Sequence, residues 1–329
     1  LISLDGIEVV GPIATGVRLS EIHGATVDNI SVIDATAEAI SLTSTDGVVL
    51  TNLYLDSVRH GIRADSGRVT NTTIDTGIIV LGNSVSGGNY GISLLERAEN
   101  NAVAGSSVVR GVDIELAADG DTGILAVVGG GASSVVIEQN SIDGDNRTTR
   151  GLWIQNAELD AGSVRILNNI IIENELHNVH VQRADRFDRF EFINNSVAIT
   201  SSSAGAIDLV RLAFDTDASI GDFFFYNNLF VGHGTDLDRA IVLTRDIPFT
   251  ADYNLFWNTA SNYLFGGNVQ PNGGNDIAGM DPFISNSTLE VLSASPAVDA
   301  GTATLAPGVD YNGTARPLGG GIDIGAHEQ

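Results

Sequence analysis

A short motif recurs nine times along the chain: a small residue, an apolar residue, and then alternating polar and apolar residues. Examples are TGVRLS, HGIRAD, YGISLL and RGLWIQ. We call the small residue of each motif the anchor. The anchors, 22 to 34 residues apart, are Gly16, Ala39, Gly61, Gly91, Gly123, Gly151, Asn178, Ala206 and Ala240. A repeat of this length with alternating apolar residues indicates short strands that stack from one repeat to the next.

A second mark, an asparagine directly before an apolar strand, falls between consecutive anchors. A buried amide without partners costs about 1–3 kcal/mol, so a repeated one must be satisfied by the fold. If it occupies the same turn in every repeat, each amide can donate to the next one, about 4.8 Å away. We therefore predict a ladder formed by Asn29, Asn52, Asn83, Asn140, Asn169, Asn195, Asn228 and Asn254. The alternative is a set of unrelated asparagines in exposed turns.

The strand pattern predicts the fold class and the division of the chain. Residues 1–275 contain short alternating runs broken by Gly, Asn, Asp and Ser, and no long segment has helical periodicity. We expect an all-β chain folded as a parallel β-helix, in which each repeat forms one coil around a continuous apolar core. Residues 276–329 hold four of the seven prolines, which stop strand addition, so we expect a C-terminal cap over the last coil.

Charge and composition exclude several classes of partner. The chain carries 41 acidic and 16 basic residues, all of the latter Arg, for a net charge of −25. Such a charge repels nucleic acid and anionic membranes, and the sequence has no 18-residue apolar run. It also has no Cys, which removes disulfides and thiolate chemistry. We therefore expect neither a nucleic-acid partner nor a membrane span.

The repeat pattern of residues 1–265 resembles that of the right-handed parallel β-helix proteins of the pectin-lyase-like superfamily. The ending, with GMDPFI, LSASPAVDAG and DYNGTARPLGGGIDIGAHE between Gly279 and Gln329, is similar to that of many bacterial secreted or surface-anchored β-helix proteins. These resemblances imply a right-handed solenoid and a secreted or cell-surface location.

The polar residues of this ending are candidates for a buried network. We expect Arg316 to hold carboxylates with its planar guanidinium, because that group forms bidentate bonds. The positions that match the recurring polar ones of the resembled endings are Asp299, Asp310, Arg316, Asp323 and Glu328. A calcium site using Asp310 and Asn312 is the alternative, although the spacing is not that of an EF-hand. No other cofactor is expected.

Outward residues of the strands that follow the anchors form the candidate binding surface. Stacked strands bring equivalent side chains about 4.8 Å apart, so they line up in columns. An indole face stacks on a sugar ring, while amide, imidazole and guanidinium groups bond to hydroxyls or carboxylates. We predict a glycan-binding stripe made of Trp153, Gln155, His180, Gln182, Arg183, Asp208 and Arg211. The alternative is an ordinary solvated face that carries one Trp.

Two functional classes follow from these features. The first is a non-catalytic extracellular module, adhesin-like, structural or glycan-binding, whose partner is a polysaccharide or cell-surface glycan. The second is a polysaccharide lyase or glycoside hydrolase of the same superfamily. The triplet at 232–234, Gly-His-Gly, resembles a short polygalacturonase motif, but the paired aspartates and the Lys of that site have no counterpart. Because Leu1-Ile-Ser-Leu has the pattern of an uncovered strand, we also expect self-association through the N-terminal end.

Overall fold

The computed structural model describes ten stretches of the chain. They are residues 2–82, 88–97, 105–129, 133–156, 162–184, 187–200, 207–215, 221–234, 238–285 and 288–329. The regular structure in these stretches consists of strands, and none of them contains a helix long and apolar enough to cross a membrane. The strands are β1 (Ile2–Ser20), β2 (His23–Val58), β3 (His60–Thr70), β4 (Thr73–Leu81), β5 (Tyr90–Arg97), β6 (Ser106–Glu115), β7 (Thr122–Gly129), β8 (Ser134–Glu138), β9 (Ser141–Arg147), β10 (Arg150–Asn156), β11 (Gly162–Leu167), β12 (Ile170–Asn174), β13 (His177–Gln182), β14 (Phe187–Ile193), β15 (Ser196–Ala198), β16 (Asp208–Ala213), β17 (Asp222–Tyr226), β18 (Leu229–Val231), β19 (Arg239–Leu243), β20 (Thr250–Asp252), β21 (Leu255–Trp257), β22 (Ser261–Phe265), β23 (Asn268–Val269) and β24 (Ile277–Ala278).

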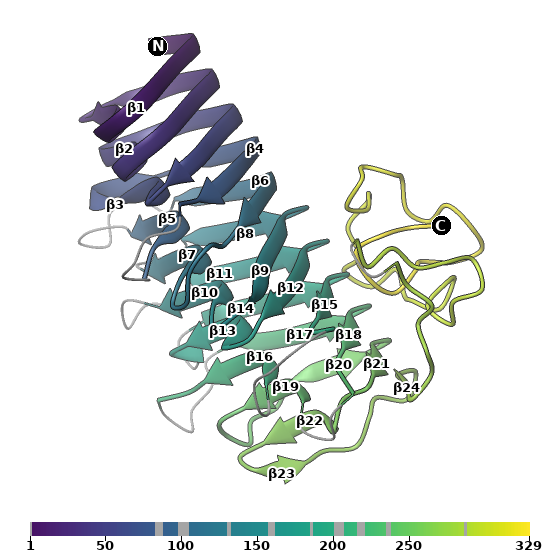
Figure 1. The fold of residues 1–329 in the computed structure, drawn as a ribbon. Coiled ribbons are helices and arrows are strands. Elements are labelled where there is room, and N and C mark those ends of the chain that lie inside the picture. The colour runs from purple at the N-terminus through teal and green to yellow at the C-terminus, as the bar shows by residue number, and fades with distance from the viewer. Residues whose placement is uncertain are drawn as a thin grey trace.

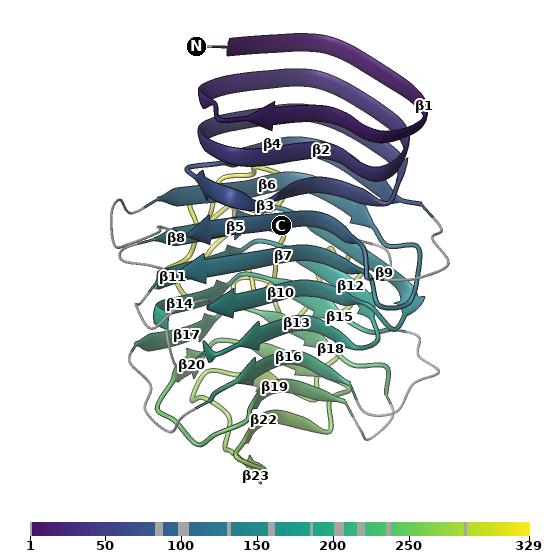
Figure 2. The same ribbon diagram turned by 90° about the vertical axis from the view of Figure 1, so that its left-hand side faces the viewer.

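Successive turns of the chain, here called coils, stack strand on strand (Figures 1 and 2). The 24 strands form one sheet whose pairings are parallel except for that of β22 with β23. Each strand pairs with the strand in the same place one coil later, as β7 does with β10 and β10 with β13. The chain is therefore all-β with a long, largely parallel sheet, which is compatible with the predicted parallel β-helix.

The pairings divide the coils into three faces. The first face contains β3, β5, β7, β10, β13, β16, β19 and β22. The second contains β4, β6, β8, β11, β14, β17 and β20. The third contains β9, β12, β15, β18, β21 and β24. The long strand β2 bends around more than one face, because it pairs with both β3 and β4.

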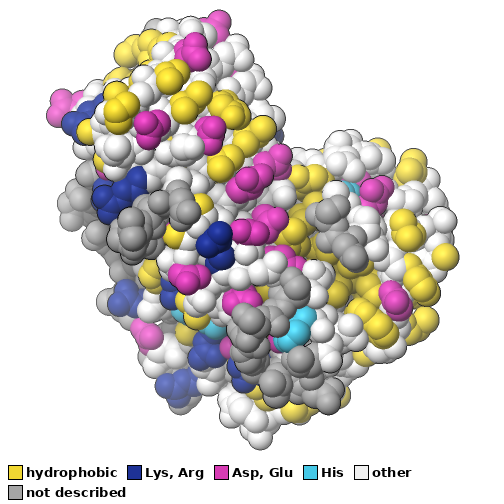
Figure 3. Space-filling model, in the orientation of Figure 1, with side chains coloured by type: hydrophobic (Ala, Val, Ile, Leu, Met, Phe, Trp, Pro, Cys, Tyr) yellow, Lys and Arg dark blue, Asp and Glu magenta, His cyan; other side chains and the backbone are white. Residues whose placement is uncertain are grey.

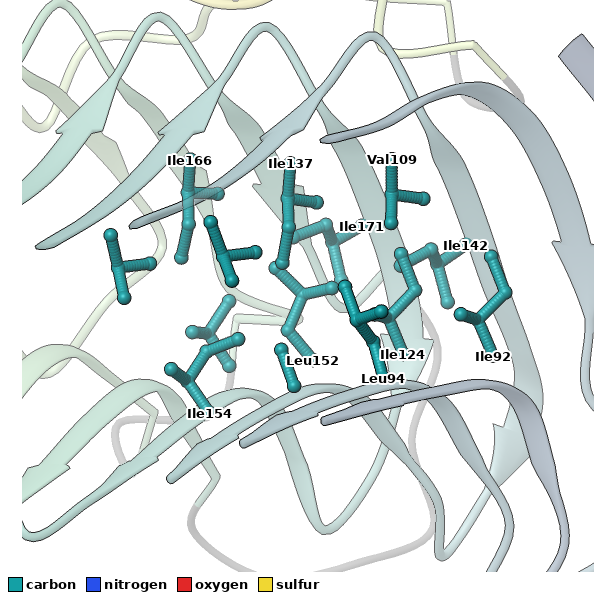
Figure 4. Close-up of a cluster of buried hydrophobic side chains, with 14 of the residues drawn as sticks. Ile92, Leu94, Val109, Ile124, Ile137, Ile142, Leu152, Ile154, Ile166 and Ile171 are labelled. Atoms are coloured by element: carbon teal, nitrogen blue, oxygen red, sulfur yellow. The ribbon is translucent and has the colours of Figure 1, made fainter. Parts of the chain in front are cut away.

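Inward side chains of the three faces meet in one apolar core. Ile92, Ile124 and Leu152 of the first face stack in register, and Ile142 and Ile171 of the third face lie near them (Figure 4). In later coils the same interior is filled by phenylalanines, with neighbouring ring centroids about 6 Å apart. The alternation seen in the sequence thus separates a buried column from an outward column on each strand.

Close packing explains why several anchors are glycines. A Cβ added to Gly151 would lie 2.4 Å from Cγ2 of Ile171 and 2.6 Å from the carbonyl oxygen of Asn178. At Gly123 the corresponding distances are 2.5 Å to Ile142 and 2.6 Å to the oxygen of Gly151. The anchor is thus the corner where the first face passes over an inward isoleucine of the third.

Buried asparagines form a continuous hydrogen-bonded series in the later coils. Each Nδ2 donates to the Oδ1 of the next coil's asparagine, and each backbone N–H donates to that same oxygen. The side-chain bonds, 2.9–3.2 Å long, run through Asn140, Asn169, Asn195, Asn228 and Asn254. The series ends at Asp276, whose carboxylate accepts the backbone N–H of Asn254 at 2.8 Å. The amides inside the turn are therefore satisfied by the neighbouring coils.

The prediction of ladder positions is wrong for Asn29 and Asn52. Both are exposed, and their amides donate to Asp5 and Asp28 of the preceding coil. Both have a φ of 52°, as does Asn168, which precedes the ladder residue in a later coil. A ladder asparagine therefore follows the residue in the left-handed turn, which is Asn168 in one coil but Gln139 or Tyr253 in others, whereas Asn29 and Asn52 occupy the turn position themselves. The predicted member at position 83 lies outside the described residues.

The C-terminal tail, residues 279–329, packs along the third face. Its Leu289, Val291 and Ile324 join Leu229 and Leu255 of that face in a second apolar cluster, and Figure 1 shows the tail beside the coils. Turn amides also donate to its backbone, from Asn168 to Val309 O at 2.7 Å and from Asn194 to Asp323 O at 3.0 Å. The prediction that it covers the last coil differs from this arrangement, because the outward residues of the third face are apolar and take the tail instead.

Arg316 organises the inside of the tail. Its side chain is buried and donates to Glu328 at 2.6 Å and to the carbonyl oxygens of Asp323 and Gly325 at 3.2 and 2.9 Å. Burial lowers the pKa of Arg316, and the nearby carboxylates oppose this effect. The expected fork is present in part: the Arg316 side chain is buried and holds a carboxylate, but among the described residues it bonds to Glu328 alone, through one nitrogen.

The other predicted carboxylates of the tail hold backbone N–H groups. Asp310 accepts from Thr314 and Glu328. Asp323 likewise accepts from the backbone of residues 299 and 329 at 2.7 Å. The described residues contain no group of three His, Asp or Glu side chains placed to hold a metal ion. Calcium binding at Asp310 and Asn312 stays a prediction.

Replacing Asn195 with Ala is expected to destabilise the fold by about 3 kcal/mol or more. The change removes three donor contacts of the Asn195 amide, leaves the backbone N–H of Asn169 without its acceptor, and takes one of three acceptors from Nδ2 of Asn169. The matched control is Asn52→Ala, whose side chain is exposed and whose loss should cost about 1 kcal/mol, largely from the left-handed backbone. Denaturant unfolding of both variants checks this, and equal costs would contradict the ladder's importance.

A candidate binding face on β10, β13, β16 and β19

The column of outward residues predicted on the first face is present with one change. Residues two positions after the anchors pair one to one between coils. The column is Arg18, Ser41, Arg63, Ser93, Leu125, Trp153, His180, Arg211 and Val242. Arg211 occupies the place that the sequence repeat had given to Asp208.

The predicted alignment of residues 206–210 is therefore wrong by three residues. Val210 pairs with Val179 and is buried, and Arg211 pairs with His180. The anchor position of this coil holds Leu209, between the paired positions 208 and 210, so the small-residue signal is missing there. In the run Ile-Asp-Leu-Val-Arg-Leu at 207–212, apolar residues occur at both odd-numbered and even-numbered positions. The hydrophobic pattern alone therefore does not distinguish the predicted register from the observed one.

A second outward column lies one position before the anchors. It contains Arg150, His177, Asp208 and Arg239, which pair in series across β10, β13, β16 and β19. Together with Trp153, His180 and Arg211 these residues form what we call the binding face. Figure 2 looks onto these strands, and in Figure 3 Arg side chains lie along the left-hand edge, where the first face lies.

Aromatic and cationic groups contact one another across this face. The rings of Trp153 and His180 are stacked, with an interplanar angle of 3° and centroids 6.4 Å apart. The Arg150 guanidinium lies 4.8 Å from the centre of the indole, and the rings of His177 and His180 meet edge to face at 5.0 Å. The result is a contiguous cluster of rings that extends over two coils.

One carboxylate and three guanidinium groups set the charge of the binding face. Asp208 is buried and forms ion pairs with Arg211 at 2.8 Å and with Arg239. Both arginine side chains remain about one-third exposed. Arg150 adds a third cation beside the indole. The face is locally positive, although the chain as a whole carries −25.

Three ring nitrogens of the binding face have no protein partner among the described residues. They are Nε1 of Trp153 and the Nδ1 atoms of His177 and His180, all of which are buried. Burial lowers the pKa of His177 and of His180 to about 4; Asp208 partly opposes the shift at His177, and the nearby arginines reinforce it. Both imidazoles are therefore neutral at pH 7. Each then offers one donor and one acceptor nitrogen.

The remaining residues of the predicted stripe lie toward the end of the strands. Gln155 pairs with Gln182, so the two amides are neighbours on the face. Arg183 follows in a left-handed turn and is directed to Asp215, with 3.5 Å between the charged groups. Arg183 therefore lies at the rim of the binding face, whereas the two glutamines extend it.

The sequence reasoning missed Arg150, His177 and Arg239. A signal was present, because each of them immediately precedes an anchor or its structural equivalent. The outward residues lie one position before the anchor and two positions after it. They are therefore three residues apart and do not follow the simple alternation of a strand, because the anchor forms a corner. The sequence prediction considered only positions after the anchor. It therefore omitted Arg150 and Arg239, which are two of the four charged residues of the binding face.

No protein-family model matches the chain, and no curated protein matches it either.

The stability of the protein is expected to fall as the pH decreases from about 6.5 to about 4. In this window the unfolded chain binds protons at His177 and His180 that the folded chain does not, because burial holds both pKa values near 4. The double variant His177→Gln/His180→Gln should lose less unfolding free energy on acidification than the parent chain. His23→Gln, at an exposed histidine, is the control. Equal losses in all three proteins would contradict the pKa shifts.

Proposed function

We propose that this chain is an extracellular or cell-surface right-handed parallel β-helix of the pectin-lyase-like superfamily, and that it binds glycans through the binding face. One observation carries the binding proposal. An indole and two imidazoles contact one another beside three guanidinium groups, and each ring has a buried nitrogen without a protein partner among the described residues. Unpaired buried polar groups are costly, so such an array is suited to a ligand that supplies hydroxyls or ring oxygens.

The dimensions of the face suit an extended sugar chain. Equivalent side chains recur at the spacing of parallel strands, about 4.8 Å, so a glycan running along the column meets a new set of groups at each coil. Trp153 supplies the stacking surface, and Gln155, Gln182 and Arg211 supply hydrogen bonds at its margins. The local positive charge accommodates acidic sugars as well as neutral ones.

The charge arrangement favours binding over catalysis. The binding face has one carboxylate among its described residues, Asp208, and two arginines already neutralise it. A glycosidase of the usual kind needs two carboxylates that act as acid and base or nucleophile. The alternative function is that of a polysaccharide lyase or glycoside hydrolase, and the activity assay described below detects it.

Location and assembly belong to the same proposal. The resemblance of the C-terminal ending supports a secreted or cell-surface location. Self-association through β1 belongs to the proposal because this strand exposes apolar side chains, which include Ile2 and Val10.

Trp153→Ala is expected to weaken glycan binding about three- to tenfold, the loss of roughly 0.5–1.5 kcal/mol of ring stacking. Affinity electrophoresis against neutral and acidic polysaccharides gives the measurement. Ser41→Ala, in the same column several coils away, is the matched control and should bind like the parent chain.

Release of reducing ends or unsaturated uronates from the same polysaccharides is measured in parallel, with and without Ca²⁺. Turnover above background would replace the binding proposal with the enzymatic one. Unchanged binding by Trp153→Ala would remove the binding face from the account.

A further inference from the structure

A cavity lies between the third face and the beginning of the tail. Its volume is about 390 Å³. The ends of β18 and β21 form one wall, and residues 281–284 of the tail form the other. Cavities that hold small organic ligands have about 300–1,000 Å³, so this one suits a ligand of one or two sugar rings.

The cavity has a rigid wall built around His233. The ring Nδ1 and the backbone N–H of His233 both contact one carboxylate oxygen of Asp238, which is fully buried. Gly232 brings the chain against the next coil, since a Cβ there would lie 2.2 Å from the carbonyl oxygen of Asn258. The carboxylate therefore fixes the imidazole that lines the cavity, and the wall is formed before any ligand enters.

An indole and two polar side chains face the same space. Trp257 ends β21, is partly buried against the second apolar cluster, and lines the cavity. Asn258 and Asp281, on opposite walls, are exposed. Asp281 uses one oxygen to accept the N–H of Phe283 at 2.8 Å. The lining thus offers a flat apolar surface with an amide and a carboxylate at its edges.

The charge of the lining selects among ligand classes. The described residues that line the cavity include no Arg, and the chain has no Lys, so this lining offers no permanent cation to hold a phosphate or carboxylate. Asp281 repels such anions. A pyranose has an apolar face for the indole and hydroxyls for the amide and carboxylate, and it carries no charge.

We propose that this cavity is a binding site for one or two neutral sugar rings, with Trp257 as the stacking surface and Asn258 and Asp281 as hydrogen-bonding groups. The site is separate from the binding face, because it lies on the third face beside the tail. It does not depend on the function proposed for the binding face.

The chain contains two tryptophans, and one lies in each site, which allows the two to be tested separately. In Trp153→Phe the emission comes from Trp257 alone, and in Trp257→Phe it comes from Trp153 alone. Both variants are titrated with glucose, galactose, cellobiose and galacturonate. We expect a saturable change in Trp257 emission with at least one neutral sugar and a weaker response to galacturonate. Any change that these sugars cause in Trp153 emission should follow a separate binding curve, because Trp153 lies in the other site.

Asp281→Asn in the Trp153→Phe background should weaken the binding of the responding sugar about three- to tenfold, because a charge-assisted hydrogen bond is lost. Asp188→Asn, at an exposed carboxylate of β14, is the matched control and should bind like its parent. The proposal is overturned if no neutral sugar changes Trp257 emission saturably, if galacturonate binds more tightly than the neutral sugars, or if Asp281→Asn binds unchanged. A response of Trp153 has no bearing on these outcomes, so failure of either site is seen by itself.

Discussion

Parallel pairing between successive coils is the constraint on which the rest of the structure depends. It brings residues one repeat apart to about 4.8 Å, so a residue type that recurs in the sequence becomes a column in space. The asparagine ladder is the inward case, because each amide is satisfied only by its neighbour in the adjoining coil. Sequence separations between ladder members vary from 26 to 33 residues, yet the bonds persist. Differences in coil length are therefore absorbed elsewhere in each coil, and the register of the core is kept.

The same constraint assembles the binding face from four strands. Arg150, His177, Asp208 and Arg239 are far apart in sequence, but strand pairing puts them in one column beside Trp153. The inward residues of these strands are apolar, so the polar groups are held at the outer surface on a rigid support. The tail, in its described contacts, packs on the third face and its turns. The tail thus covers the third face, whereas the first face carries the aromatic and cationic side chains of the binding face.

Much of this arrangement follows from the sequence, and the departures have physical causes. The anchors from Gly16 to Asn178 predict the register, because alternation and a crowded corner act on each coil in the same way. The prediction fails at Asp208, where Leu209 takes the anchor position and adjacent apolar residues permit two registers. Asn29 was misplaced because it occupies the left-handed turn itself, whereas each ladder asparagine follows the turn residue by one position, and the sequence pattern does not separate the two places. The place of the tail could not be foreseen, since it depends on which outward face is apolar.

Hydrogen exchange of individual backbone amides tests the ladder, and with it the register of the coils, most directly. The backbone N–H groups of Asn169, Asn195 and Asn228 donate to buried amide oxygens of the next coil. They should therefore exchange as slowly as the central strand amides, and much more slowly than those of the exposed Asn29 and Asn52. If the three exchange as fast as the exposed turns do, the ladder does not hold adjacent coils together, and the register of the binding face loses its support.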